Sequence, residues 1–178
     1  MKTFLLFAGV LLAIFALPFV VALFLPKTFT VESEVVINRP RREVFDYLKL
    51  LKNQEQFSKW ARLDPAMKKQ YRGTDGTVGA VFAWESTSAN VGIGEQEITQ
   101  IVDGERIDVV IRFQSPFEST DPAYLKTESV GDAQTKVTWG YHGKMRYPTN
   151  LMTPIIRGTI KADMQTGLDT LKAVLEKR

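Results

Sequence analysis

A run of 23 consecutive residues, from Thr3 to Leu25, carries no charged side chain. At a rise of about 1.5 Å per residue, a helix of this length extends roughly 34 Å, which is enough to cross a hydrocarbon core about 30 Å thick. The apolar part of a cleaved signal peptide is shorter, at about 7 to 15 residues. We therefore expect an uncleaved transmembrane signal-anchor over residues 1–25. A signal peptide cut after Ala22 is the alternative.

The side of the membrane on which the remaining chain lies depends on two opposing signals. The short flank before the apolar run favours export of the domain that follows it. Lys27 and the basic segment Arg39–Arg42 come soon after the run, and such charges favour the cytoplasmic side. Because long folded domains often override this bias, we expect the domain to lie on the outer side of the membrane.

Residues 26–178 form the rest of the chain, and 153 residues is a common size for a single domain. A formal net charge of +3 for the whole chain is too small and too scattered for a nucleic-acid surface, so we expect no nucleic-acid partner. The absence of cysteine excludes thiol catalysis, disulfides and thiolate metal sites. Function must therefore come from other side chains.

The domain opens with a strand and continues with short helices. Residues 29–37 alternate and are rich in β-branched side chains, which predicts a strand. Asn38 is a good N-cap and Pro40 suits a first helical turn, so a helix is expected from there to about Leu51. A second short helical piece is expected near residues 53–60.

Strands separated by turns follow from Tyr71 onward, and the chain closes with a helix. Asp103-Gly104 between two β-rich runs predicts a tight hairpin. After Pro148, apolar residues recur at helical spacing from Ile156 to Leu175, which predicts one long helix with a buried face. These elements make an α+β domain, in which a curved antiparallel sheet wraps around the long C-terminal helix.

This order of elements, together with several short motifs, resembles the START-like (SRPBCC) superfamily, often labelled polyketide cyclase/dehydrase-like, in particular its bacterial branch with an N-terminal membrane helix. The motifs are residues 37–40 leading into Val44-Phe45, residues 60–65, residues 79–85 and residues 135–139. The resemblance covers essentially residues 26–177. It implies a helix-grip fold after one transmembrane helix. Together with the orientation expected from the flanking charges, this gives a single-pass protein of the bacterial inner membrane with its domain on the periplasmic side.

The resemblance also implies that an apolar molecule binds between the sheet and the long helix, because members of the superfamily bind lipids, quinones and polyketides. The first expectation is therefore a membrane-tethered domain that binds a hydrophobic small molecule or lipid, with no catalytic activity. One alternative is a cyclase or hydrolase-like enzyme. Another is a structural or protein-interaction module whose core is filled. A fold alone cannot choose among these.

Counting by twos along the strands separates an apolar inner face from a polar outer face. Val78, Ala80, Phe82 and Trp84 share one side of a strand, and Met145 shares a side with Val137. If the inner face encloses a cavity, a set of apolar residues lines it, but the same residues could close on one another as a core. The expected ligand-binding residues are Phe82, Trp84, Ile111, Phe113, Trp139, Tyr141, Ile156, Ile160 and Met164.

Catalytic candidates are few and weak. Glu95 and Glu97 lie two residues apart in a probable strand, so they share a face, and an inward orientation would raise at least one pKa. Paired carboxylates can act as acid and base, and Tyr141 could assist them. Cross-strand pairing of both carboxylates with Lys or Arg in solvent is the more common arrangement. The two-residue alternation along this strand does not indicate which of its faces is buried.

The remaining chemical motifs are incomplete. The only histidine, His142, falls on the polar side of the last strand, so we expect it to face water. Gly92-Ile93-Gly94 lacks the third glycine and the following helix of a dinucleotide-binding loop. One histidine without cysteine makes a zinc site improbable. We expect neither a metal nor a cofactor.

Overall fold

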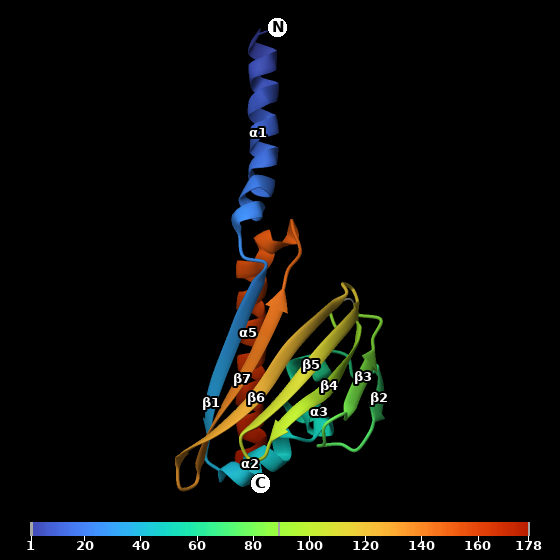
Figure 1. Ribbon diagram of the computed structural model, residues 1–178, viewed down its shortest axis with the longest axis vertical. Coiled ribbons are helices and arrows are strands. Elements are labelled where there is room, and N and C mark those ends of the chain that lie inside the picture. Colours follow the sequence, from blue (N-terminus) through green and yellow to red (C-terminus); the bar gives the residue numbers. More distant parts are fainter. Residues whose placement is uncertain (1, 89, 178) are drawn as a thin grey trace.

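The computed structural model describes residues 2–88 and 90–177. The apolar run forms helix α1 (Lys2–Phe24), which Figure 1 shows extending away from the rest of the chain. In the described part of the chain, no helix combines the length and the apolarity that crossing a membrane requires. The predicted membrane span is therefore not confirmed.

The domain is built on one antiparallel sheet of seven strands in the order β1-β7-β6-β5-β4-β3-β2. The first and last strands pair along their full length, from Thr28 opposite Lys144 to Ile37 opposite Thr135. This sheet and the helices that accompany it confirm the α+β layout, and α5, which follows β7, packs against β1. The strands are β1 (Thr28–Ile37), β2 (Lys68–Arg72), β3 (Val81–Glu85), β4 (Ile93–Val102), β5 (Arg106–Ser115), β6 (Ser119–Gly131) and β7 (Gln134–Lys144).

The helices gather on one face of this sheet, which we call the inner face (Figure 1). The long C-terminal helix runs from Thr153 to Glu176, in agreement with the predicted periodicity. The Asp103-Gly104 hairpin between β4 and β5 is also present, and Gly104 takes the positive φ that such a turn needs. The helical elements are α2 (Arg41–Leu48), η1 (Leu51–Asn53), α3 (Gln54–Phe57), α4 (Lys59–Leu63), η2 (Thr149–Met152) and α5 (Thr153–Glu176).

The expected N-cap of the first domain helix is wrong. Pro40 occupies the cap position of α2, and no side chain caps the helix. Asn38 instead joins distant elements, because its backbone N–H donates to Glu176 Oε1 at 2.7 Å and its side-chain oxygen accepts from Gln134 Nε2 at 2.8 Å. Asn38 is therefore engaged by tertiary partners at the end of α5 and the start of β7 instead of capping α2.

Two expected inner positions also differ from the structure. Val78 is 59% exposed, because β3 begins only at Val81 and Val78 still belongs to the preceding turn. Ala80 and Phe82 do lie inside, at 2% and 5% exposure. Met145 lies beyond β7, which ends at Lys144. In both cases the residue lies outside the strand, where inner and outer positions no longer alternate.

The core is densest at the end of the domain far from α1. Large side chains there, contributed by β1, α2, η1, β7 and α5, have almost no solvent exposure. Burial on this scale is the main source of stability in a domain of this size. The fully buried residues of this end are Ile37, Val44, Phe45, Leu48, Leu51, Val137, Leu168, Leu171 and Leu175.

Truncation of a buried leucine in α5 should therefore weaken folding strongly. We expect Leu168→Ala to lower the free energy of unfolding by about 2–5 kcal/mol, since it removes buried methyl groups and leaves a cavity. Ile155→Ala, on the same helix but 63% exposed, should change it by less than about 0.5 kcal/mol. Urea unfolding followed by tryptophan fluorescence measures both. Equal losses would contradict the assignment of the core.

Candidate functional site

The end of the inner face near α1 is less completely covered than the far end. Large apolar side chains from β3, β5, β7 and the first turns of α5 are only partly buried there. We call this region the open end, and define it by Trp84, Ile111, Phe113, Tyr141, Ile156 and Ile160. All six belong to the set predicted to bind a ligand. Of the other three, Phe82 and Met164 are buried at 5% and 1% exposure, and Trp139 is partly buried.

Aromatic side chains form two groups on the inner face. On the β3–β5 side, the ring of Trp84 lies 5.8 Å from those of both Phe82 and Phe113. On the β7 side, Trp139 makes edge contacts with Phe57 at 6.0 Å and Trp60 at 5.8 Å. These rings present apolar area with a defined geometry, which suits either a packed core or the wall of an apolar binding site.

A small cavity lies between the short helical elements α2 to α3 and strands β4 to β7. Its volume is about 20 Å³, and the surrounding side chains include Leu48, Leu51, Ile111 and Trp139. The amides of Gln54 and Gln96, at 7% and 8% exposure, also reach it. A water molecule fits such a space, whereas sites for small organic ligands measure roughly 300–1,000 Å³. An organic ligand therefore does not fit this cavity unless the interior widens.

A buried carboxylate lies on the inner face at the open end. Asp121 of β6 is 2% exposed, and its Oδ2 accepts hydrogen bonds from the hydroxyls of Ser119 at 2.7 Å and Tyr141 at 2.9 Å. Its other oxygen, Oδ1, has no hydrogen-bond partner among the described residues. Asp121 is not among the predicted site residues, although it shares the side of β6 that carries Ala123 and Leu125, so the two-residue period indicates an inner position.

The environment of Tyr141 determines what its hydroxyl can do. Burial raises the pKa of this phenol well above its usual value, and the neighbouring Asp121 raises it further through its charge and its hydrogen bond. The phenol therefore stays protonated over the physiological range and donates its proton to Asp121. Such a group orients a polar neighbour and is poorly suited to act as a base.

The two glutamates considered as catalytic lie on the outer face. Glu95 pairs with Arg72 and with Arg112 at 3.2 Å, and Glu97 pairs with Arg112 at 2.7 Å. Gln96, between them, points to the inner face, opposite Phe82 and Ile111. The sheet thus separates both carboxylates from Tyr141. This is the solvent-facing, cross-strand arrangement that the sequence left open as the more common case.

His142 also lies on the outer face. It is exposed, as expected, and its Nδ1 lies 3.0 Å from the hydroxyl of Thr30 on β1. Within the described residues, no group of three or more histidine, aspartate or glutamate side chains could hold a metal ion. The outer face of the sheet is a surface of ion pairs rather than a site.

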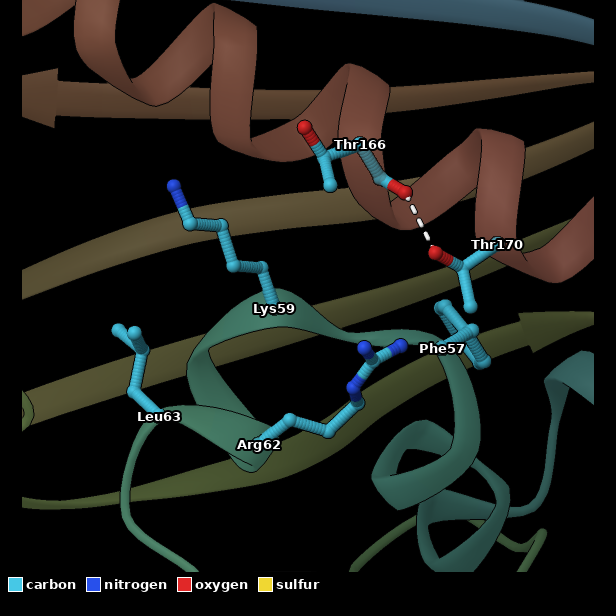
Figure 2. Close-up of a pocket in the computed structure, with 6 residues that line it drawn as sticks. All are labelled: Phe57, Lys59, Arg62, Leu63, Thr166 and Thr170. Atoms are coloured by element: carbon cyan, nitrogen blue, oxygen red, sulfur yellow. Dashed lines mark hydrogen bonds between the residues drawn. The ribbon is translucent and has the colours of Figure 1, made fainter.

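A shallow surface pocket of about 160 Å³ lies between α4 and α5 (Figure 2). Its hydroxyl groups are already used, because Thr170 Oγ1 donates to the carbonyl of Thr166 and Thr166 Oγ1 donates to that of Ala162. Lys59 is paired with Asp163. Arg62 points into the pocket in Figure 2 and has no ion pair among the described residues. One exposed cation does not by itself define a binding site.

The buried position of Tyr141 can be tested by titrating the tyrosines with alkali. In the folded protein, wild type and Tyr141→Phe should show the same phenolate absorbance at about pH 11, because this phenol retains its proton. In urea, wild type should show one more ionised tyrosine. Because the folded state holds this proton more tightly, Tyr141 stabilises folding below roughly pH 10, and this contribution is lost as the pH rises further. A folded-state difference between the two proteins would contradict the burial.

Comparison with proteins of known structure supports the assignment of the fold. CalU16 from Micromonospora echinospora is 11% identical, with 82% of this chain and 73% of that chain covered and a TM-score of 0.57. The Aha1 dimer from Colwellia psychrerythraea is 13% identical, with 83% of this chain and 96% of that chain covered and a TM-score of 0.57. Protein MLL2253 from Mesorhizobium loti is 16% identical, with 84% of this chain and 98% of that chain covered and a TM-score of 0.60. At these identities the likeness shows the fold alone. No curated protein sequence matches significantly.

A family-level comparison is more specific. The family described as polyketide cyclase/dehydrase and lipid transport matches residues 28–176, which is nearly the whole domain from β1 to the end of α5. The match agrees with the helix-grip arrangement, in which a seven-stranded antiparallel sheet packs against a long C-terminal helix. The chain therefore belongs to the polyketide cyclase/dehydrase and lipid transport family, within the START-like (SRPBCC) superfamily.

Proposed function

We propose that this domain binds a hydrophobic small molecule at the open end of its inner face. The observation that carries the proposal is the contrast between the two ends of the core. At the far end, side chains such as Leu171 and Ile37 are fully buried, whereas Trp84, Phe113 and Ile156 at the open end keep part of their apolar surface in water. A bound apolar molecule would remove that surface from water, at about 25 cal/mol per Å².

Binding requires the open end to widen, because the enclosed cavity of about 20 Å³ is too small for an organic ligand. The first turns of α5 are suited to such a movement. Ile155 is 63% exposed, and Ile156 and Ile160 are only partly buried, so less packing is lost there than at Leu168 or Leu171. In this proposal α5 pivots on its well-packed second half.

The structure offers less support for an enzyme of the cyclase or hydrolase kind. The glutamates that such an enzyme would need lie across the sheet from the open end, each paired with an arginine. The raised pKa of Tyr141 keeps its phenol protonated at neutral pH, so it is poorly suited to act as a base. The small cavity is compatible with the remaining alternative, a filled core with a surface for a protein partner, and the experiment below includes that outcome.

Two neighbouring isoleucines of α5 allow a matched test of ligand binding. Protein purified from its own cells should carry an apolar molecule detectable by native mass spectrometry, and Ile156→Asp should lose it, since a carboxylate would enter the apolar site. Ile155→Asp places the same charge one residue away in solvent and should retain the molecule.

Two results would contradict the proposal. Retention of the molecule by Ile156→Asp would place it elsewhere on the protein. A wild-type protein that carries no molecule, and gains no thermal stability from lipid extracts, would indicate a filled core.

We further propose that α1 attaches the domain to a lipid membrane. The large apolar side chains of α1 that the structure describes are exposed, and their exposure in water would be unfavourable. A bilayer provides an apolar phase for them, and attachment would keep the domain close to poorly soluble ligands. Among the described side chains of α1, the large apolar ones that are half or more exposed are Phe4, Phe7, Leu12, Ile14, Phe15, Leu17, Phe19, Leu23 and Phe24.

Basic residues around the base of α1 support this attachment. Lys27, Lys144, Arg146 and Arg157 are exposed, and none forms an ion pair with a described residue. Residues 25–31 and 142–158, which contain all four, include no aspartate or glutamate. We call these four residues the basic collar. Each basic residue close to an anionic bilayer contributes about 1 kcal/mol of attraction.

The joint between α1 and the domain keeps the collar at the base of the helix. Asn150 of η2 is fully buried and donates to the carbonyls of Ala22 at 2.7 Å and Leu25 at 3.2 Å. The backbone N–H of Met145 donates to the carbonyl of Lys27 at 2.7 Å. The bonds from Asn150 satisfy carbonyls at and just after the end of α1, and the bond from Met145 fixes the segment that follows, so the helix is tied directly to the domain.

Vesicle flotation of the full chain tests both parts of the membrane proposal. Vesicles that contain phosphatidylglycerol should bind the wild type more tightly than phosphatidylcholine vesicles, and added salt should reduce the difference. Neutralising the collar to glutamine should weaken the binding to phosphatidylglycerol vesicles by roughly 10²–10³-fold. A control that neutralises Lys68, Lys126, Lys172 and Lys177 removes the same charge away from α1 and should change little.

The two parts fail in different ways. Equal binding to both vesicle types would overturn the role of the collar and leave the apolar attachment standing. Binding to neither would overturn the attachment itself.

A further inference from the structure

We infer that the molecule bound at the open end carries a hydrogen-bond donor, a hydroxyl or an amino group, which Asp121 accepts. This inference rests on the proposed binding function and adds the chemical class of the ligand's polar end. It is carried by a buried carboxylate with one unused oxygen, at the place where the apolar inner face is least covered.

The hydrogen bonds of Asp121 are unevenly distributed. An ionised carboxylate can accept about four hydrogen bonds, and this one receives two from the described residues, both on Oδ2. Oδ1 receives none, although the residue is 2% exposed, and no described lysine or arginine forms an ion pair with it. A buried oxygen without a partner is costly, so a ligand that supplies a donor gains the free energy of satisfying it.

The surroundings of Asp121 are those of an apolar site with one polar point. In the sheet it lies opposite Ile111, a residue of the open end. Its partner Tyr141 also belongs to the open end and lies 6.2 Å, ring to ring, from Phe29 of β1. A ligand that covers Ile111 and Tyr141 with its apolar part therefore has its polar end close to Asp121.

The same geometry excludes other polar ends. The hydroxyls of Ser119 and Tyr141 both direct their protons at Oδ2, so neither is free to donate to a ligand. The site thus offers acceptors and no donor from these three side chains. A carboxylate or phosphate on the ligand would meet the carboxylate of Asp121, and neither of these two hydroxyls could offset the repulsion between them, which is unfavourable. The site should prefer an amine or an alcohol over an acid with the same chain.

Three probes with the same alkyl chain can test this preference. Decylamine, decanol and decanoate differ only at the polar end, and their binding to the full chain at pH 7 can be measured by calorimetry below the concentrations at which they aggregate. We expect wild type to bind the amine and the alcohol at least about tenfold more tightly than the acid. Asp121→Asn, which is neutral and of similar shape, should reduce the preference for the amine over the acid to less than about threefold.

Control variants separate the role of this site from general charge effects. Asp132→Asn removes the same charge from an exposed turn between β6 and β7, and the preference should persist in it. Tyr141→Phe removes one of the two donors to Oδ2, which leaves the carboxylate with more free capacity, so the preference should persist or increase. This second variant keeps the test decisive if Asp121→Asn does not fold.

Each outcome bears on a separate claim. Similar affinities of wild type for all three probes, or an amine preference that survives in Asp121→Asn, would overturn the inference while leaving the binding of apolar molecules intact. Loss of the preference in Tyr141→Phe would also overturn it. Failure of wild type to bind any of the three probes would overturn the proposed function itself.

Discussion

The pairing of β1 with β7 is the contact on which the rest of the domain depends. It joins the first strand to the last one and brings α5, which follows β7, onto the inner face of the sheet. Ser33 of β1 donates to the carbonyl of Lys161, and Lys172 donates to that of Val36, so β1 and α5 are also tied directly. Because these partners lie more than 100 residues apart, the core closes only once the whole chain is in place.

The position of the candidate site follows from how completely the side chains of α5 are buried along its length. At the far end the helix packs on β1 and carries fully buried leucines, and at the open end its isoleucines are only partly covered. The result is a domain whose stable end holds the fold while its other end keeps apolar surface available. Asp121 and Tyr141 lie at that second end, where a polar group of a ligand can satisfy the oxygen that the protein leaves unpaired.

Local patterns predicted most of the elements, and they failed where a partner is distant. Helical spacing located α5, and Asp103-Gly104 located the β4–β5 hairpin, because both signals depend on neighbouring residues. Asn38 was assigned to a local cap but hydrogen-bonds to Glu176 and Gln134. Val78 was assigned to the inner face, although alternation holds only within a strand and β3 starts three residues later.

The sequence by itself determined the class of fold and which residues of a strand share a face, because the two-residue and 3.6-residue periods depend only on the local backbone. It also determined the uncharged run that becomes α1. Which face of β4 is buried was decided only by the tertiary structure, where Gln96 turns inward and Glu95 and Glu97 meet arginines outside. The same holds for Asp121, whose unused oxygen results from the position of Tyr141, 20 residues away on the next strand. Hydrogen-bond satisfaction is a property of groups in space, and no local pattern encodes it.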